Sequence, residues 1–235
     1  EEVGGDIQFE NVWFSYTGSE YVLKDLSFRI EPGQSVALVG VTGSGKTSIA
    51  SVLTRLYEIQ KGAIWLDGID IRNIEKTALR YIIGLVSQDV FLFSGNLRDN
   101  ITLFNPIADA KVIETVKSLG LMPFINRMQD GLNTRISERG ANLSVGERQF
   151  ISLTRIILYN PCIIILDEAT SSMDPISEVL IQDALQKVTQ GRTSLFIAHR
   201  LSTILHCDKI IVLGKGVKIE EGNHETLLKT GGLYS

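Results

Sequence analysis

The sequence has only two cysteines and five prolines in 235 residues, and it lacks any long apolar run. Cys162 and Cys207 lie far apart, which excludes both a disulfide framework and the close ligand spacing of a zinc site. This cysteine usage fits a reducing compartment such as the cytosol. A membrane-spanning helix needs about 18 or more consecutive apolar residues, so no segment is predicted to cross a bilayer.

The sequence also has no excess of basic charge. Its formal net charge is −4, with acidic and basic residues interspersed, so neither a nucleic-acid partner nor a polybasic membrane-binding segment is expected. The opening residues 1–5 resemble neither a signal peptide nor a transit peptide, and the first residue is not methionine. We therefore expect the chain to be a piece of a longer protein.

The most informative segment is residues 40–47, which read G-V-T-G-S-G-K-T. It follows the apolar run 35–39 and precedes the helix-prone stretch 48–57, which is the context of a phosphate-binding loop. Closely spaced glycines let backbone N–H groups point at phosphate oxygens, Lys46 adds a positive charge, and Thr47 offers a hydroxyl to Mg²⁺. The segment predicts a nucleoside triphosphate site.

The residues before position 89 are otherwise β-prone. Ile7 to Phe14 alternates between apolar and polar residues, and Asp67-Gly68 is a favoured two-residue hairpin turn. Lys24-Asp25 is interpreted as a turn that precedes a strand. These patterns predict an antiparallel β edge, and the expected strands of this part are 7–14, 26–30, 35–39, 63–66, 69–71 and 82–86.

The pattern then becomes helical from about Val90 to Tyr159, with no convincing strand. Asn105-Pro106 is interpreted as the start of a helix that continues through 108–119, and a second helix is expected at 122–128. Three later apolar runs, separated by helical segments, indicate parallel strands covered on both faces. These runs are 162–166, 194–198 and 209–213.

The predicted fold class is therefore α/β, a P-loop NTPase core with a mostly parallel sheet, an antiparallel β edge and an inserted helical subdomain. The content of hydrophobic residues, 44%, is enough for one domain with a substantial core. Residues 1–89 and 160–235 are assigned to the core with its β subdomain, and residues 90–159 to the helical subdomain.

Two acids, Asp167 and Glu168, end the apolar run 162–166 at the edge where open α/β sheets bind ligands. Asp167 is placed to hold the shell of a Mg²⁺ ion, and Glu168 to accept a proton from the water that attacks the γ-phosphate. The alternative is that both are solvated acids at a strand end.

Residues 143–149 read L-S-V-G-E-R-Q and allow two compatible interpretations. Ser144 and Glu147 form the S-x-x-E pattern of a capping box, so the segment could simply start a helix. A helix start rich in N–H donors also binds anions, so Ser144 and Gly146 could meet a γ-phosphate. Asp174 before Pro175 is likewise a standard helix cap.

Three further side chains are candidates by position. His199 and Gln88 follow predicted strands, so both face the edge that carries Asp167. The amide of Gln88 could reach a metal or a water there. Tyr16 is more often a core or edge aromatic than a ligand contact, and His206 and His224 are interpreted as structural or exposed.

Together these segments resemble the nucleotide-binding domain of an ATP-binding cassette (ABC) transporter over nearly the whole chain. The Walker A loop of that family corresponds to 40–47, its Walker B strand to 163–167 followed by Glu168, its signature motif to 143–147, and its D-loop to 171–174. Gln88 matches the Q-loop and His199 the switch histidine, and Tyr16 falls where the family has an adenine-stacking aromatic.

The resemblance implies an Mg-dependent ATPase that closes head to tail with a second nucleotide-binding domain over two ATP molecules. Lys46, Gln88, Glu168 and His199 are then the expected catalytic residues, and Thr47, Gln88 and Asp167 the expected Mg²⁺ ligands. The residues expected to contact ATP are Tyr16, Gly40, Thr42, Gly43, Ser44, Gly45, Lys46, Thr47, Ser48, Gln88 and Asp167, with Ser144, Gly146, Glu147 and Asp174 from the signature and D-loop.

A finer match points to exporters, in which the ATPase is fused behind a membrane domain. The segment from Phe91 through Ile101 and the tripeptide 138–140 carry this likeness. It implies a place on the cytoplasmic face of a membrane, within a transporter. Two departures concern the usual L-S-G-G-Q signature, because Val145 replaces its first glycine and Glu147 its glutamine. We expect the site to function, although its affinity for the nucleotide of the partner is in question.

The apolar tripeptide 91–93, beside Gln88, is either core or a docking surface for a helix of the membrane domain. A second hypothesis for the chain as a whole is a soluble or regulatory ABC-type ATPase without a transport role. The exporter-like segment from Phe91 to Ile101 argues against the soluble version, and turnover would argue against the regulatory one.

Overall fold

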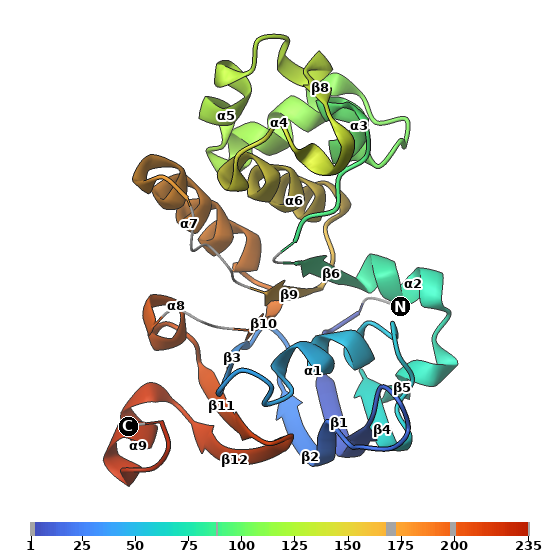
Figure 1. Cartoon of the computed structure of the whole chain (residues 1–235), viewed down its shortest axis with the longest axis vertical. Coiled ribbons are helices and arrows are strands. Elements are labelled where there is room, and N and C mark those ends of the chain that lie inside the picture. The colour runs from blue at the N-terminus through green and yellow to red at the C-terminus, as the bar shows by residue number, and fades with distance from the viewer. Residues whose placement is uncertain (1–2, 88, 168–172, 198–200, 235) are drawn as a thin grey trace. The chain divides into compact units, whose positions relative to one another are not determined.

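The structure is a computed structural model that describes residues 3–87, 89–167, 173–197 and 201–234. Its internal contacts define two compact units, shown in Figure 1 and described here one at a time. The second unit contains all of the predicted helical segment 90–159 and also a later helix, and the predicted subdomain boundaries stay a prediction. Unit 1 comprises Glu1–Leu85, Cys162–Glu168 and Gly191–Ser235, and unit 2 comprises Val86–Pro161 and Ala169–Gln190.

The main sheet has six strands in the order β12-β11-β3-β10-β9-β6. Strands β11, β3, β10 and β9 run parallel, and β12 is antiparallel to β11. Each parallel strand is apolar and buried along most of its length, as expected for strands covered on both faces. The bounds are β3 Ser35–Val39, β6 Ile83–Val86, β9 Ile163–Asp167, β10 Thr193–Ile197, β11 Lys209–Gly214 and β12 Val217–Gly222.

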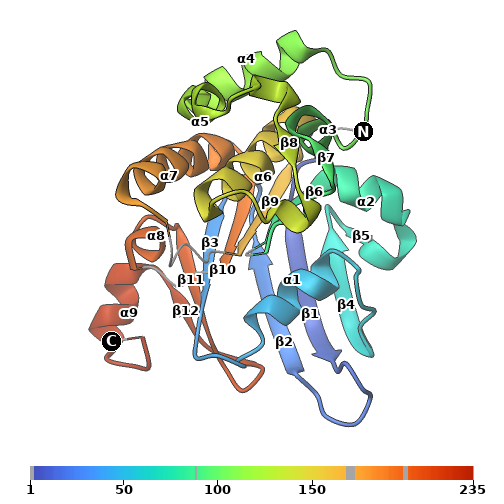
Figure 2. The ribbon, with the colours of Figure 1, turned by 45° about the horizontal axis from the view of Figure 1, so that its top comes forward.

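A second, antiparallel sheet has the order β2-β1-β4-β5, and Figure 2 shows β2, β1 and β4 side by side. Asp67 (φ 49°) and Gly68 (φ 77°) form the predicted turn between β4 and β5, since both central residues of such a turn need positive φ. The mostly parallel sheet and this antiparallel sheet confirm the predicted fold class. The bounds are β1 Ile7–Phe14, β2 Leu23–Ile30, β4 Lys61–Leu66 and β5 Ile69–Asp70.

Strand β2 begins three residues before the predicted start, because Lys24-Asp25 is not a turn. Asp25 has a φ of 47° inside the strand, and Asn11 in β1 has a φ of 45°. The side-chain amide of Asn11 donates to the Asp25 carboxylate at 2.9 Å. The register with β1 shifts between Val12, which pairs with Leu26, and Phe14, which pairs with Leu23. A bulge therefore takes up Lys24 and Asp25, the residues that the sequence pattern assigned to a turn.

The core of unit 1 joins residues of both sheets with the buried face of helix α1 (Lys46–Leu53). Helix α1 ends earlier than the predicted stretch 48–57, because Arg55 adopts a left-handed φ of 52°. Helix α2 (Lys76–Ile82) was not predicted. The remaining helical segments of unit 1 are the 3₁₀ turn η1 Ile71–Asn73, α8 Leu201–Leu205 and α9 His224–Thr230.

Unit 2 is mainly helical, and the stacked rings of Phe124 and Phe150, 5.4 Å apart, lie in its core. The predicted start of a helix at Asn105-Pro106 is wrong, because the Asn105 side chain donates to Thr102 O and the Tyr159 hydroxyl instead of capping. The expectation of no strand between 90 and 159 is wrong, because the short strands β7 and β8 pair there. The bounds are α3 Leu97–Thr102, α4 Asp109–Leu119, α5 Met122–Arg127, α6 Val145–Tyr159, α7 Pro175–Thr189, β7 Gly95–Asn96 and β8 Arg135–Ile136, with 3₁₀ turns Gly131–Asn133 and Glu138–Gly140.

Among the residues that the structure describes, no helix combines the length and the apolar character that crossing a bilayer requires.

No disulfide joins Cys162 and Cys207. Cys207 is buried, and Cys162 is partly buried with its thiol directed at the carbonyl oxygen of Val3, 3.1 Å away. Burial raises the pKa of the Cys162 thiol. The thiolate, which is the reactive form, is therefore disfavoured at Cys162.

Candidate nucleotide site

The loop between β3 and α1 is held tightly on one side and open on the other. A Cβ atom built at Gly40 would lie 2.3 Å from Leu213 O, and one at Gly45 would lie 2.7 Å from Leu23 Cδ2. A Cβ at Gly43, by contrast, would meet no atom within 4 Å among the described residues. Glycine is thus required where the loop presses on β11 and β2, and the Gly43 side is open to a ligand.

Lys46 folds back over this loop. Its Nζ donates to Gly40 O at 2.7 Å and to Val41 O at 3.2 Å, and the residue is only 6% exposed. Burial lowers the pKa of Lys46, and the negative charge of Asp167 partly opposes that shift. A buried ammonium held by neutral carbonyl groups, with a carboxylate near it, is suited to exchange these partners for phosphate oxygens.

Two further features of the loop fit an anionic ligand. Ser44 Oγ is buried and has no hydrogen-bond partner in the described part of the chain. Helix α1 begins at Gly45 without a side-chain cap, and its first turn carries no acidic residue. Because the first N–H groups of a helix lack partners within the helix, this end can donate hydrogen bonds to a phosphate.

Strand register places Asp167 at the same edge as the loop. Ile197 in β10 pairs with Leu38 in β3 on one side and with Asp167 in β9 on the other, so these three strands end together beside Gly40. Asp167 is partly exposed. The sequence-based expectation that the Walker-type acid faces the loop edge therefore agrees with the strand pairing.

The donor groups here fit Mg²⁺ bound together with phosphates. Asp167 supplies a carboxylate at the strand edge, and Thr47 supplies an exposed hydroxyl in the first turn of α1. No cluster of three or more His, Cys, Asp or Glu side chains able to hold a metal occurs in the described residues. Mg²⁺ characteristically uses one or two carboxylates plus substrate phosphates rather than a cage made by protein alone.

Tyr16 is half exposed, and three contacts fix its ring. Its hydroxyl lies 3.0 Å from the Oγ of Ser48, at the start of α1. Phe14 and Tyr57 pack edge to face against its ring, at centroid distances of 4.7 and 4.9 Å. Tyr57 was not among the predicted site residues, and an aromatic residue just beyond the end of α1 was the only signal for it.

The signature segment lies in unit 2, where Ser144 is the N-cap of α6. Ser144 Oγ accepts from Glu147 N at 3.2 Å, and the Glu147 carboxylate accepts from Ser144 N at 2.8 Å. The capping-box interpretation is thus confirmed.

Next to it, Gly146 packs closely on α7. A Cβ at Gly146 would lie 2.9 Å from Ser177 Cβ. Asp174 caps α7 by accepting from Ser177 N at 3.0 Å, and hydrogen bonds from Ser177 lower the pKa of the Asp174 carboxyl. The cap interpretation of Asp174 is confirmed, and Gly146 has a packing role as well as its proposed one.

Three of the predicted catalytic residues, Gln88, Glu168 and His199, lie outside the described residues, as do 171 and 172 of the predicted D-loop. Thr42 is exposed in the phosphate loop. The roles of all the predicted site residues stay predictions.

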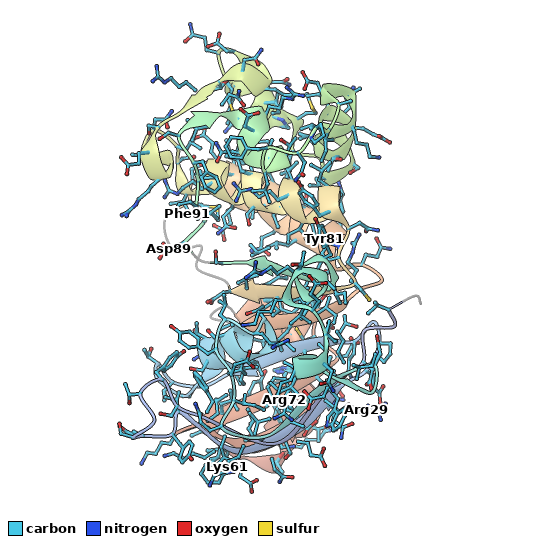
Figure 3. All side chains as sticks on the ribbon, turned by 90° about the vertical axis from the view of Figure 1, so that its right-hand side faces the viewer. Arg29, Lys61, Arg72, Tyr81, Asp89 and Phe91 are labelled. Carbon is cyan, nitrogen blue, oxygen red and sulfur yellow. The ribbon has the colours of Figure 1, made fainter. Side chains whose placement is uncertain are left out.

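The tripeptide 91–93 is neither wholly core nor wholly exposed. Leu92 is buried, whereas Phe91 (labelled in Figure 3) and Phe93 are 62% and 42% exposed. Their rings meet edge to face at a centroid distance of 5.0 Å. The core alternative therefore holds for Leu92, and the two phenylalanines are available to a partner.

Comparison with known proteins decides the family. The family model described as "ABC transporter" matches residues 23–171. The chain belongs to the ABC transporter family. This confirms the resemblance that the loop at Lys46 and the signature segment carried.

Two relatives match this chain over its whole length. The uncharacterized ABC transporter ATP-binding protein YknV of Bacillus subtilis (strain 168) is 48% identical over all of this chain and 39% of its own length. The ATP-dependent lipid A-core flippase of Legionella pneumophila (strain Paris) is 48% identical over all of this chain and 40% of its own length.

Among solved structures, a bacterial Atm1-family ABC exporter with ATP bound matches with a TM-score of 0.91 and 39% identity, over 98% of this chain and 40% of that one. The chain is thus an ABC transporter domain, as predicted, and it resembles this exporter over nearly its whole length. It spans about two-fifths of the length of the curated relatives that it matches.

Proposed function

We propose that this ABC domain binds and hydrolyses Mg-ATP and, paired head to tail with a second nucleotide-binding domain, drives export through a membrane domain. The observation that carries the proposal is the phosphate loop with Lys46 folded over it. The buried Nζ of Lys46 is held by two loop carbonyls near the charge of Asp167, and the loop is open at Gly43.

In this proposal the residues of unit 1 grip the nucleotide. Lys46 and the N–H groups of the loop at 40–45 bind the phosphates, Thr42 and Ser48 flank them, and Tyr16 stacks on the adenine. Base stacking on an aromatic ring contributes about 1–3 kcal/mol per base, and the contacts of Tyr16 with Ser48 and Tyr57 hold its ring ready for it.

The catalytic roles follow the same logic. Thr47, Gln88 and Asp167 hold Mg²⁺, which when bound neutralises charge on the phosphate oxygens. Glu168 accepts the proton of the attacking water, and His199 donates a hydrogen bond to the γ-phosphate. Positioning and electrostatic stabilisation supply the rate enhancement.

A second copy or a related domain completes each site in this proposal. Ser144, Gly146 and Glu147 at the start of α6 face the γ-phosphate held by the partner, and Asp174 lies in the D-loop that runs beside it. The position of these residues at the start of α6 supports this role, because a helix N-terminus stabilises negative charge.

The proposed membrane partner docks near Gln88 and on the exposed rings of Phe91 and Phe93. Two relatives are named as ATP-binding/permease proteins, and the chain covers 35% and 40% of their lengths. The remaining length of such a protein leaves room for a fused membrane domain. The domain would then lie on the cytoplasmic face of that membrane.

The test is Mg-ATPase activity measured against protein concentration. If two domains enclose ATP, specific activity rises with concentration, whereas a regulatory module that only binds ATP stays flat and near zero. Glu168→Gln should abolish turnover and retain ATP-dependent dimers, and full turnover by Glu168→Gln would overturn the assignment of the base.

A further inference from the structure

The backbone of residues 91–93 is held by side chains rather than by a strand. Leu92 is buried, and its Cδ1 lies 2.5 Å from where a Cβ of Gly140 would be. The close approach to Gly140 anchors Leu92 inward. Because neighbouring side chains of an extended segment point to opposite sides, this anchor turns Phe91 and Phe93 outward.

Asn100, in α3, pairs with this segment as a neighbouring strand would. Its Oδ1 accepts from Phe93 N at 2.9 Å, and its Nδ2 donates to Phe93 O at 2.9 Å and to Asn96 O at 3.0 Å. Asn100 is fully buried. Its amide therefore satisfies both backbone groups of Phe93, which would otherwise be costly to remove from water.

Arg155, in α6, links Asn100 to the start of the tripeptide. Its Nε donates to Asn100 O at 2.7 Å, and one terminal nitrogen donates to Phe91 O at 3.0 Å. Burial lowers the pKa of Arg155 to about 10, and no ion pair joins it to a carboxylate in the described ranges. A mostly desolvated guanidinium bound only to neutral oxygens is unfavourable by itself, which favours a role other than stability.

A third ring extends the outward surface. Phe104 is 60% exposed, and its ring meets that of Phe93 at a centroid distance of 5.6 Å. Leu103 and Phe104 have left-handed φ values of 50° and 63°, an arrangement that costs about 1 kcal/mol or more per residue. The Tyr159 hydroxyl, also on α6, donates to Thr102 O just before them, so α6 supports this turn too.

We propose that Arg155 and Asn100 are positioning residues for the docking surface, which consists of Phe91, Phe93 and Phe104. They fix the surface to α6, the helix that begins at Ser144. Arg155 lies eleven residues after Ser144, roughly 16 Å along a helix, so one helix carries both the signature end and the side chain that holds the docking surface. This inference rests on the proposed function, and the occupant of the surface is a helix of the membrane domain fused to this chain.

The choice of arginine is part of the argument. The guanidinium presents several N–H donors in a fixed fork and reaches two carbonyl groups at once. A lysine could donate to the same carbonyls only as a flexible point charge, and a methionine would fill a similar volume without any donor. These two replacements therefore separate hydrogen bonding from packing.

The test uses the longer protein that contains this domain, with Phe91→Cys as the reporter and a membrane-impermeant maleimide as the probe. With Arg155 intact, labelling should be slow because the membrane domain covers the surface. Arg155→Met should raise the labelling rate about tenfold or more, and Arg155→Lys should restore part of the protection. Arg135→Met, at an exposed arginine of the same unit, is the matched control and should change nothing.

A second readout excludes a general loss of structure. The affinity for Mg-ATP, set by the loop at Lys46, should stay within about twofold in Arg155→Met. Protection that persists in Arg155→Met would overturn the role of Arg155 and leave docking intact. Rapid labelling with Arg155 present would instead overturn the docking surface itself, which belongs to the proposed function. Loss of Mg-ATP affinity together with protection would overturn the positioning role in favour of a purely structural one.

Discussion

The carboxylate of Glu147 accepts hydrogen bonds from both the backbone N–H and the hydroxyl of Ser144, at 2.8 and 3.0 Å. In the proposed dimer these two donors of Ser144 face the γ-phosphate held by the partner. The side chain of Glu147 thus places a negative charge where a more negative group must approach, whereas the glutamine usual in the family would be neutral.

Glu147→Gln should therefore strengthen ATP-dependent dimerisation. Two like charges about 4 Å apart repel by ~1 kcal/mol even in water, so we expect dimers at least about fivefold tighter. The measurement is sedimentation with Mg-ATP in a Glu168→Gln background, which prevents hydrolysis. Glutamine can still accept from Ser144 N, so the cap of α6 is kept, and unchanged or weaker dimers would show that the charge of Glu147 is irrelevant.

ATP affinity should fall at alkaline pH. Lys46 binds phosphate in its charged form, and burial lowers its pKa, so the charge is lost at a lower pH than for an ordinary lysine. The affinity for ATP is then at its maximum below the lowered pKa of Lys46, and it decreases as the pH rises through that pKa. Titrations between about pH 7.5 and 10 test this, with Lys46→Arg as control, because arginine stays charged throughout that range.

Tyr16→Ala should weaken ATP binding by roughly 5- to 150-fold, the equivalent of ~1–3 kcal/mol of base stacking. Tyr16→Phe keeps the ring and removes only the hydroxyl contact with Ser48, so it should lose little. Binding of inorganic triphosphate, which has no base, is the second control. If Tyr16→Ala weakens triphosphate as much as ATP, Tyr16 does not stack on the adenine.

Gly146→Ala should destabilise the protein by about 1–3 kcal/mol, as overpacking does, although alanine is usually the better helix former. The added Cβ would lie 2.9 Å from Ser177 Cβ. Adding Ser177→Gly removes that atom and keeps the backbone N–H that donates to the Asp174 carboxylate. The double variant should therefore recover part of the lost stability. Chemical unfolding of the four proteins completes the cycle, and additive effects would contradict a direct contact.

Much of the fold was predictable, because local patterns of apolar residues mark its strands in the sequence. Strand β1 matches its prediction residue for residue, and the turn at Asp67-Gly68 follows from a two-residue preference. The start of α4 was not predictable. The side chain of Asn105 bonds to Tyr159, 54 positions later, and no local rule anticipates such a partner.

The candidate site likewise combines features that local sequence determines with contacts between residues far apart in the chain. The glycine spacing around Lys46 is a local requirement of a phosphate loop, so the sequence identified it. The packing of Gly146 on Ser177 and the bonds from Arg155 to Asn100 join residues far apart in the chain. Their geometry arises only when α6 packs on its neighbours, and residue types alone gave no signal for it.

The state of the two native thiols has a practical consequence. Cys207 is buried, and the partly buried Cys162 is held against Val3 with its ionised form disfavoured. Spectroscopic probes should therefore react faster at newly introduced surface cysteines than at Cys162 or Cys207. Distance measurements during the ATP cycle can therefore start from the native sequence, with both cysteines kept in place.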